Sequence, residues 1–268
     1  LRTRNYLIKE NKIKFDNYKK GELISTRYAY GMALSRLVES DKNMLVLDSE
    51  VSNSTFSSFA KEKKPDQFIE CFIAEQNMIG MALGLSKKGH TVFASTFAAF
   101  LTRAHDHLRM AALSQPNFVV CGSHAGVSIG EDGPSQMGLE DIALFRTLPN
   151  SIILYPSDAV STEKLTFLAH SLHGLKYLRT TRSATPVIYN LEEKFPLGDF
   201  KILQESRSDE VVLIGAGITV FECLRAGKIL KKCAIIDLYS IKPFNSVKFI
   251  TFVKEHGNKI IVIEDHYN

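Results

Sequence analysis

The stretch Phe68-Ile-Glu-Cys-Phe-Ile-Ala-Glu-Gln-Asn-Met-Ile-Gly-Met-Ala-Leu-Gly-Leu-Ser-Lys-Lys-Gly-His-Thr-Val-Phe-Ala-Ser95 reads as a strand, a helix and a second strand. Phe68–Ile73 is an apolar run of strand length, and Glu75–Lys87 repeats its apolar residues at helical spacing. Gly89 ends that helix, and the apolar run Thr91–Ser95 follows directly. This order predicts two parallel strands joined by a helix that packs on the sheet.

The same alternation continues on both sides of this unit. Further strands are predicted at residues 44–48, 118–121, 152–155 and 176–179, and helices at 27–38, 100–113 and from Ser157 or Asp158 to about Ala169. The fold class is therefore α/β, with a parallel sheet covered by helices on both faces. Such sheets bind ligands beyond the carboxyl ends of their strands, so the chemistry is expected in residues 49–55, 74–77, 96–100, 122–136 and 180–183.

A smaller α/β unit is predicted after the charged stretch Glu192–Asp199. Its strands are expected at 211–214, 234–237 and 260–263, with a helix at 220–230. About three strands make a thin domain, so this unit looks truncated at Asn268. The chain also begins with Leu1 rather than Met, which is typical of a fragment or a processed product. Residues 1–20, rich in lysine, are predicted to be a solvated linker.

Composition argues against several classes of protein. A length of 268 residues with 45% hydrophobic and 23% charged residues is typical of a globular protein with one large and one smaller domain. The net charge of +4 is spread along the chain and does not point to nucleic acid. No apolar run reaches the roughly 20 residues that cross a bilayer. The four cysteines are far apart without a C-x-x-C pair, so no metal site is expected and a cytoplasmic protein with buried thiols is predicted.

One glycine motif is similar to a dinucleotide fingerprint. Gly215-Ala-Gly217 follows an apolar strand, and Asp237 ends the next strand. The third glycine position is occupied by Val220, whose side chain would block the close approach of helix and strand that the motif requires. A tight turn without a ligand is the better interpretation, and NAD binding is not expected.

Two other features leave two interpretations each. The glycine-rich loop Gly122–Gln136 follows a buried strand and is long enough to bind a ligand, although it can also be an ordinary surface loop. Glu75 opens a helix directly after a strand, where the helix dipole alone favours a carboxylate.

A set of motifs favours a functional role for both the glycine-rich loop and Glu75. The motifs are Ile73-Ala-Glu-Gln-Asn-Met78, Ser95-Thr-Phe-Ala-Ala-Phe100, Gly122–Met137, Ser25-Thr-Arg-Tyr-Ala-Tyr-Gly31, Asn53-Ser-Thr-Phe56, Tyr155-Pro-Ser157, Arg179-Thr-Thr-Arg182 and Glu264-Asp-His-Tyr267. In these motifs, from about Tyr18 to its end, the chain resembles a transketolase of the animal type. That family uses thiamine diphosphate to transfer a two-carbon ketol unit from a ketose phosphate to an aldose phosphate.

The resemblance implies a domain arrangement and a dimer. Residues 21–191 would be the pyrimidine-binding domain, and residues 200–268 a truncated C-terminal domain. Family active sites lie between two subunits, so a homodimer or a dimer with a diphosphate-binding half is expected. The Gly-Asp-Gly start of the diphosphate–metal motif does not occur in this sequence. Mg²⁺ or Ca²⁺ would therefore be held by a missing N-terminal domain, and this chain would be a fragment or one partner of a split enzyme.

Site residues follow from the same resemblance. Glu75 matches the carboxylate that hydrogen-bonds N1′ of the cofactor's aminopyrimidine and activates the cofactor. Phe100 matches the aromatic residue that stacks on this ring, and Phe97 lies beside it or belongs to the core. The sugar-phosphate contacts correspond to Arg27, Ser54, His124 and Arg182, a substrate hydroxyl contact to Asp132, and a contact near the reacting carbonyl to Gln136.

Two alternatives to a transketolase remain open. One is a related thiamine enzyme, such as deoxyxylulose-phosphate synthase or a ketoacid dehydrogenase β subunit. The phosphate contacts disfavour the dehydrogenase. The other is a regulatory paralogue without catalytic activity.

Overall fold

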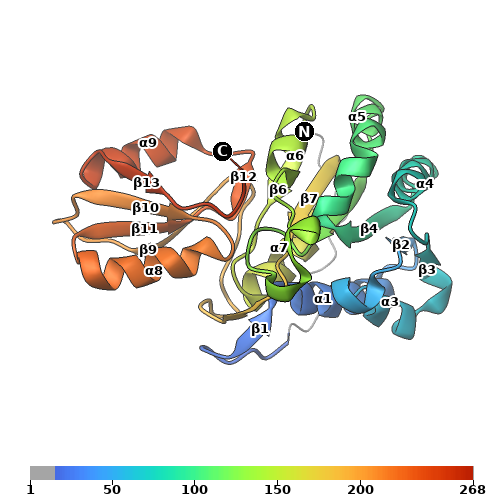
Figure 1. Cartoon of the computed structure of the whole chain (residues 1–268), viewed down its shortest axis with the longest axis horizontal. Helices are drawn as coiled ribbons and strands as arrows, with labels where there is room; N and C mark the ends of the chain where they lie inside the picture. The colour runs from blue at the N-terminus through green and yellow to red at the C-terminus, as the bar shows by residue number, and fades with distance from the viewer. Residues whose placement is uncertain (1–15, 268) are drawn as a thin grey trace.

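The computed structural model describes residues 16–267 and contains a larger and a smaller sheet (Figure 1). Seven strands form the larger sheet. Their spatial order is β12-β6-β7-β5-β4-β2-β3. The strands are β2 (Met44–Asp48), β3 (Phe68–Glu70), β4 (Thr91–Phe97), β5 (Phe118–Ser123), β6 (Ile152–Leu154), β7 (Leu175–Arg179) and β12 (Ser240–Lys242). All neighbours are parallel except β12, which runs antiparallel to β6. The predicted parallel sheet is confirmed, with one antiparallel edge strand added.

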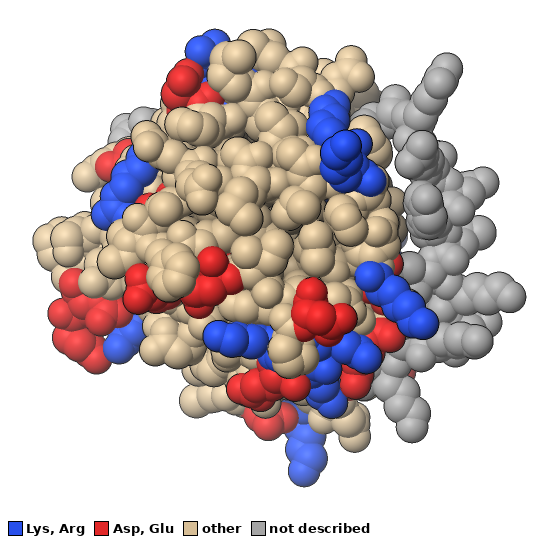
Figure 2. Space-filling view, turned by 90° about the vertical axis from the view of Figure 1, so that its right-hand side faces the viewer, with Lys and Arg blue, Asp and Glu red and all other residues tan. Residues whose placement is uncertain are grey.

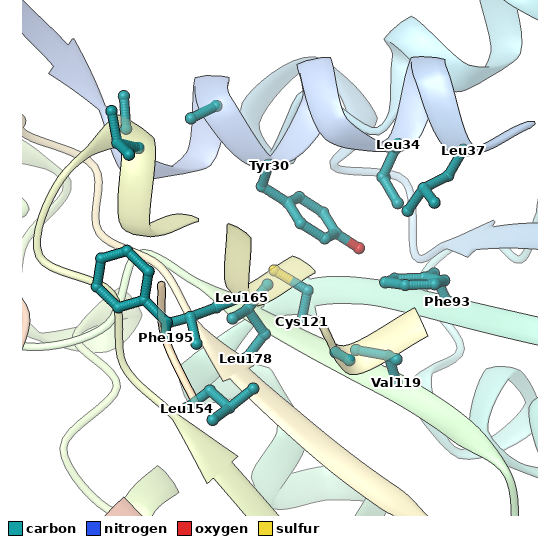
Figure 3. Packing of buried hydrophobic residues seen from close by; sticks show 14 of the residues in the cluster. Tyr30, Leu34, Leu37, Phe93, Val119, Cys121, Leu154, Leu165, Leu178 and Phe195 are labelled. Atoms are coloured by element: carbon teal, nitrogen blue, oxygen red, sulfur yellow. The ribbon is translucent and has the colours of Figure 1, made fainter. Parts of the chain in front are cut away.

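Helices cover both faces of this sheet, as predicted. They are α1 (Thr26–Ser40), α4 (Glu75–Lys87), α5 (His105–Leu113), α6 (Asp141–Thr147) and α7 (Ala159–Ser171), with short helices α2 (Ser52–Thr55) and α3 (Ser58–Lys63). Alternate residues of β4 separate the core into two clusters. Phe93 packs with α1 and α7 through side chains such as Tyr30 and Leu165 (Figure 3), whereas Val92 packs with α4 and α5 through Met78 and Leu108.

The helix starts agree with the sequence signals. Asp158 caps α7, and its side chain accepts a hydrogen bond from the backbone N–H of Ser161 in a capping box. The side chain of Ser25 accepts from the N–H of Tyr28 at the start of α1. Glu75 is the first residue of α4, as expected.

Two local predictions were wrong. The first strand of the quoted stretch ends at Glu70 instead of Ile73, because its partner β2 ends at Asp48 and Phe72 turns the chain with a φ of 55°. The helix predicted at 100–113 is instead a 3-10 segment, η3 (Ala98–Ala104), followed by α5. Helix α6 was not predicted.

The smaller sheet has the order β13-β10-β11-β9. It contains β9 (Lys201–Gln204), β10 (Val211–Gly215), β11 (Cys233–Asp237) and β13 (Ile260–Val262), with α8 (Thr219–Leu230) and α9 (Ser246–Glu255). The fourth strand, β9, is antiparallel and was not predicted. A Cβ atom at Gly215 would lie 2.8 Å from the backbone nitrogen of Val220, so the glycine turn packs tightly against the start of α8.

The two units share secondary structure. After β11 the chain returns to the larger sheet as β12, where Ser240 pairs with Leu154 of β6. A separate two-stranded antiparallel sheet is formed by β1 (Leu23–Ser25), which directly precedes α1, and β8 (Ala184–Pro186). The described part of the predicted linker, residues 16–20, has no helix or strand, and residues 1–15 lie outside the described residues.

Three further features concern surface charge, the cysteines and membrane-spanning helices. On the face shown in Figure 2, acidic and basic side chains are mixed in the lower half, below a broad uncharged area. All four cysteines are buried free thiols. Within residues 16–267, no helix is both long and apolar enough to cross a membrane.

Candidate active site

The predicted site residues gather at the carboxyl ends of the parallel strands. Seven of the nine form two groups that touch through the stacked rings of Phe97 and His124. We call Glu75, Phe97 and Phe100 the aromatic–carboxylate cluster, and Arg27, His124, Asp132 and Arg182 the arginine cluster.

Glu75 is a buried carboxylate with a cationic partner. It is 2% exposed. Its Oε1 accepts a hydrogen bond from Nη1 of Arg103 at 2.9 Å and lies 3.5 Å from the hydroxyl of Thr96. The guanidinium of Arg103 also lies over the Phe100 ring, 4.6 Å from its centroid. A charged carboxylate in a buried position requires such a partner.

Phe97 connects the two clusters. Its ring stacks on Phe100 with centroids 5.2 Å apart and on His124 with centroids 3.9 Å apart. Phe97 is buried at the end of β4, and Phe100 is half-buried in η3. Phe97 is thus a core residue that also contacts residues of both clusters.

His124 occupies the turn that follows β5. Its φ of 56° is unusual for a residue other than glycine and turns the chain into the loop. Its Nδ1 lies 3.0 Å from the hydroxyl of Ser123. Burial, followed by the positive charges of Arg27 and Arg182, lowers the pKa of His124 to about 4, although Asp132 acts in the opposite direction. The imidazole is therefore neutral at physiological pH.

Two guanidiniums face this imidazole. Nε of Arg182 pairs with Oδ2 of Asp132 at 3.0 Å, and its Nη2 reaches the exposed Glu131 at 3.0 Å. Nε of Arg27 donates to the carbonyl of Arg182 at 3.3 Å. Burial and the charge of Arg182 both lower the pKa of Arg27. The charge of Arg182 thus acts on Arg27, and both charges act on His124, so the three side chains belong to one site.

The short helix α2, which carries Ser54, is held by Asp48 at the end of β2. The Asp48 carboxylate accepts hydrogen bonds from the hydroxyls of Thr55 and Ser57, each at 2.8 Å. Burial raises the pKa of Asp48 to about 7, even though these hydrogen bonds lower it. The carbonyl of Ser54 accepts from Nη1 of Arg27 at 2.8 Å, so Ser54 lies at the edge of the arginine cluster.

Gln136 is the site residue with the weakest structural link to the others. It ends the 3-10 segment η5 (Pro134–Gln136) and is half-buried. Within residues 16–267, its side chain makes no hydrogen bond to the other predicted site residues. It belongs to the same loop as His124 and Asp132.

Sequence reasoning missed two parts of the site. The first is Arg103, although its position three residues after Phe100 is the spacing of neighbours on a helix face. The second is a buried network around Arg179, which is completely buried at the end of β7. Arg179 donates to Asp141 through Nε at 2.7 Å and to Asp265 through Nη1 at 2.6 Å. No spacing rule connects these three residues.

Two tyrosines complete the Arg179 network. Tyr155 donates to Asp265 at 2.9 Å, and Tyr177 donates to Asp141 at 2.5 Å. Burial disfavours the charge of Arg179, but Asp141, Tyr155 and Asp265 together hold its pKa well above the ordinary value. This network lies between the larger sheet and the end of the described chain.

The chemistry of the two clusters is distinct. A buried carboxylate beside a stacked pair of phenylalanines fits a flat, basic heteroaromatic ring such as an aminopyrimidine. Two adjacent guanidiniums with an imidazole fit a dianionic phosphate. Within residues 16–267, no group of three or more His, Cys, Asp or Glu side chains is placed to hold a metal ion.

Comparison with known families gives a consistent result. The model of the transketolase pyrimidine-binding domain matches residues 22–187, and that of the transketolase C-terminal domain matches residues 198–268. Mouse transketolase-like protein 2 is 52% identical over 255 residues, which are 93% of this chain and 41% of that protein. Human transketolase is 47% identical over 256 residues, which are 94% of this chain and 41% of that protein.

A solved structure also resembles the chain over most of its length. A split-gene transketolase, described as an inactive β4 tetramer, has a TM-score of 0.82 and 33% identity. The match covers 91% of this chain and 79% of that chain. The present chain spans about two fifths of the length of the curated relatives named above.

Proposed function

The chain belongs to the transketolase family, and on this premise we propose that it is the cofactor-activating and substrate-binding part of a transketolase. The complete enzyme transfers a two-carbon ketol unit from a ketose phosphate to an aldose phosphate. The observation that carries the proposal is the stacking of Phe97 on His124, which joins the aromatic–carboxylate cluster to the arginine cluster. A cofactor ring and a sugar phosphate bound in the two clusters would be neighbours.

The aromatic–carboxylate cluster would bind the aminopyrimidine of thiamine diphosphate. When bound, this cofactor supplies the carbon atom that carries the two-carbon unit. Glu75 would share a proton with N1′ of the ring, which a carboxyl group can do and an amide cannot. Phe100 would fix the plane of the ring by stacking, with Phe97 behind it.

The arginine cluster would bind the phosphate of the sugar. Arg27 and Arg182 would donate to its oxygens, together with Ser54 and neutral His124. Asp132 would accept from a sugar hydroxyl, and Gln136 would lie near the reacting carbonyl.

The proposal includes a partner and two domains. Residues 21–191 would form the pyrimidine-binding domain, and residues 200–268 would belong to the C-terminal domain. A homodimer, or a dimer with a diphosphate-binding half, would place the diphosphate and its Mg²⁺ or Ca²⁺ in a domain other than these two. The description of the split-gene relative as inactive supports the need for a second half. The cytoplasm is the proposed compartment.

A second candidate is a regulatory paralogue that pairs with an active transketolase. The observation in its favour is the similarity to mouse and bovine transketolase-like proteins, at 52% and 50% identity. Another thiamine enzyme, such as deoxyxylulose-phosphate synthase, is the remaining alternative within the same chemistry.

Ketol transfer from xylulose 5-phosphate to ribose 5-phosphate tests the proposal directly. We expect no activity from the chain alone, and activity when it is mixed with a diphosphate-binding half, thiamine diphosphate and Mg²⁺. Inactivity of the mixture, with a folded chain that still pairs, would favour the regulatory paralogue.

The Glu75→Gln variant tests the role of the carboxylate. We expect the turnover of the mixture to fall by roughly 10²- to 10⁴-fold, because the amide cannot exchange the proton. Glu222→Gln is the matched control, since Glu222 is an exposed partner of Arg225 on α8. Full turnover of the Glu75→Gln mixture would refute the assigned role.

A further inference from the structure

The loop that carries His124 and Asp132 is closed at its base. Ala125 and Gly138 form an isolated parallel bridge. The N–H of Gly126 donates to the carbonyl of Gly138 at 2.9 Å, and the N–H of Gly138 lies 3.5 Å from the carbonyl of His124. The two ends of the loop are thus held side by side. A contact that holds this base in place therefore also holds the first residues of the loop in place.

Asp265, from the C-terminal unit, lies directly against this base. Gly126 has a φ of +78°, and a Cβ atom at this position would lie 1.8 Å from Oδ2 of Asp265. Only glycine therefore allows the carboxylate to approach the backbone so closely. Two residues after Asp265, the N–H of Tyr267 donates to the carbonyl of Leu139 at 3.0 Å.

Arg179 ties Asp265 and the base together. Its Nη1 donates to Oδ1 of Asp265 at 2.6 Å, and its Nη2 donates to the carbonyl of Gly138 at 3.1 Å. The hydroxyl of Tyr155 holds the other carboxylate oxygen. Asp265 is 6% exposed and Arg179 is completely buried, so these charge-assisted hydrogen bonds are shielded from water.

We propose that Asp265 is a positioning residue: through Gly126 and Arg179, it fixes the loop that carries His124 and Asp132. The C-terminal unit would then act on affinity for the phosphorylated sugar without touching it. The sugar as ligand rests on the function proposed above, whereas the effect on the loop depends only on contacts within the chain.

Hydrogen exchange of the 268-residue chain tests the loop effect. In Asp265→Asn the side chain keeps its shape but loses the charge that Arg179 requires. We expect the amides of residues 124–138 to exchange roughly tenfold faster, the factor expected when one charge-assisted hydrogen bond is weakened, with β4 and α4 unchanged. Glu264→Gln is the matched control, because the Glu264 side chain is 42% exposed and lies next in sequence.

Two further readouts separate a positioning role from a general loss of stability. Tyr155→Phe removes only one hydrogen bond to Asp265 and should accelerate exchange in the same segment by a smaller factor, which keeps the test valid if Asp265→Asn folds poorly. In the mixture with a diphosphate-binding half, Asp265→Asn should raise KM for ribose 5-phosphate roughly tenfold and leave kcat close to the original value.

The outcomes are distinct. Faster exchange spread evenly over both units, or unchanged exchange in residues 124–138, would overturn the positioning role. A loosened loop with an unchanged KM would overturn the part of the inference that concerns affinity. A loosened loop in a chain that shows no ketol transfer with any half would support the role of Asp265 and refute the proposed function.

Discussion

Arg179 and Arg182 lie three residues apart at the end of the same strand, yet their environments are opposite. Arg179 is completely buried between the carboxylates of Asp141 and Asp265. The side chain of Arg182 is 32% exposed and pairs with Asp132 on the neighbouring loop. The two side chains are chemically identical, so the difference between them comes from their burial and their partners.

The difference shows which cation is available to a ligand. Arg179 has two buried carboxylates and a carbonyl as partners, so its donors are already engaged. The donors of Arg182 also have partners, the carbonyl of Ile129 and the carboxylates of Glu131 and Asp132, but its side chain is 32% exposed and that of Glu131 is 80% exposed, so a ligand can replace them. Burial and the charge of Arg182 also lower the pKa of Arg27. A cation that is disfavoured by burial and by a neighbouring charge, as Arg27 is, gains stability when an anion enters the site. We therefore expect Arg179 to support folding and Arg182 to support binding.

Arg179→Met should give the largest effect on stability. Removing one partner of a buried ion pair leaves Asp141 and Asp265 without their counter-charge, which costs about 3–5 kcal/mol in the free energy of unfolding. Denaturation by urea measures this change. Arg225→Met is the control, because the exposed pair of Arg225 with Glu222 should contribute less than about 1 kcal/mol. Equal losses in both variants would contradict the contrast drawn here.

Arg182→Met should instead weaken binding. The loss of hydrogen bonds to a charged phosphate corresponds to about 1.5–3 kcal/mol, or roughly 10- to 150-fold in the Kd for ribose 5-phosphate. The free energy of unfolding should change by less than about 1 kcal/mol, because Arg182 is partly exposed. Calorimetric titration and urea denaturation give the two numbers. A stability loss as large as that of Arg179→Met would remove the distinction.

The titration of His124 should show the smallest but most local effect. Its pKa of about 4 lies below the ordinary value of 6.5. Between pH 4 and pH 6.5, His124 therefore binds a proton more readily in the unfolded chain than in the folded chain. His124 therefore contributes stability above pH 6.5 that is lost as the pH falls towards 4. In Arg182→Met the pKa should rise above 4 but stay below 6.5, because burial is the first cause. NMR titration of the imidazole would contradict this account if the pKa were normal in the unchanged chain.

Local sequence rules predicted the parts of the molecule that depend on neighbours in the chain. The strand and helix pattern around residues 44–179 follows from apolar spacing, and Asp158 was recognised as a candidate cap from its residue type. The antiparallel strands β9 and β12 were not predicted, because they are short and their pairing depends on partners far along the chain.

The site residues can be divided in the same way, into those that a local rule places and those that depend on distant partners. His124 lies directly after β5, and Glu75 follows the end of β3 by a short turn, so the general rule for parallel sheets places both at the correct edge. The contact of Arg179 with Asp265 joins residues 86 positions apart, and no periodicity encodes it. The assigned roles of Glu75, Phe100 and the arginine cluster remain predictions, although the structure brings these residues together.

The return of the chain to the larger sheet as β12 limits which segments can be exchanged with those of a related protein. The family match to the C-terminal domain begins at residue 198, yet β12 and Asp265 from that segment complete the sheet and the loop base of the other unit. A swap of everything after residue 198 would therefore also replace an edge strand and a buried counter-ion of the pyrimidine-binding unit. A working chimera should therefore keep Asp265 together with Arg179 and Gly126, which contact it across the boundary.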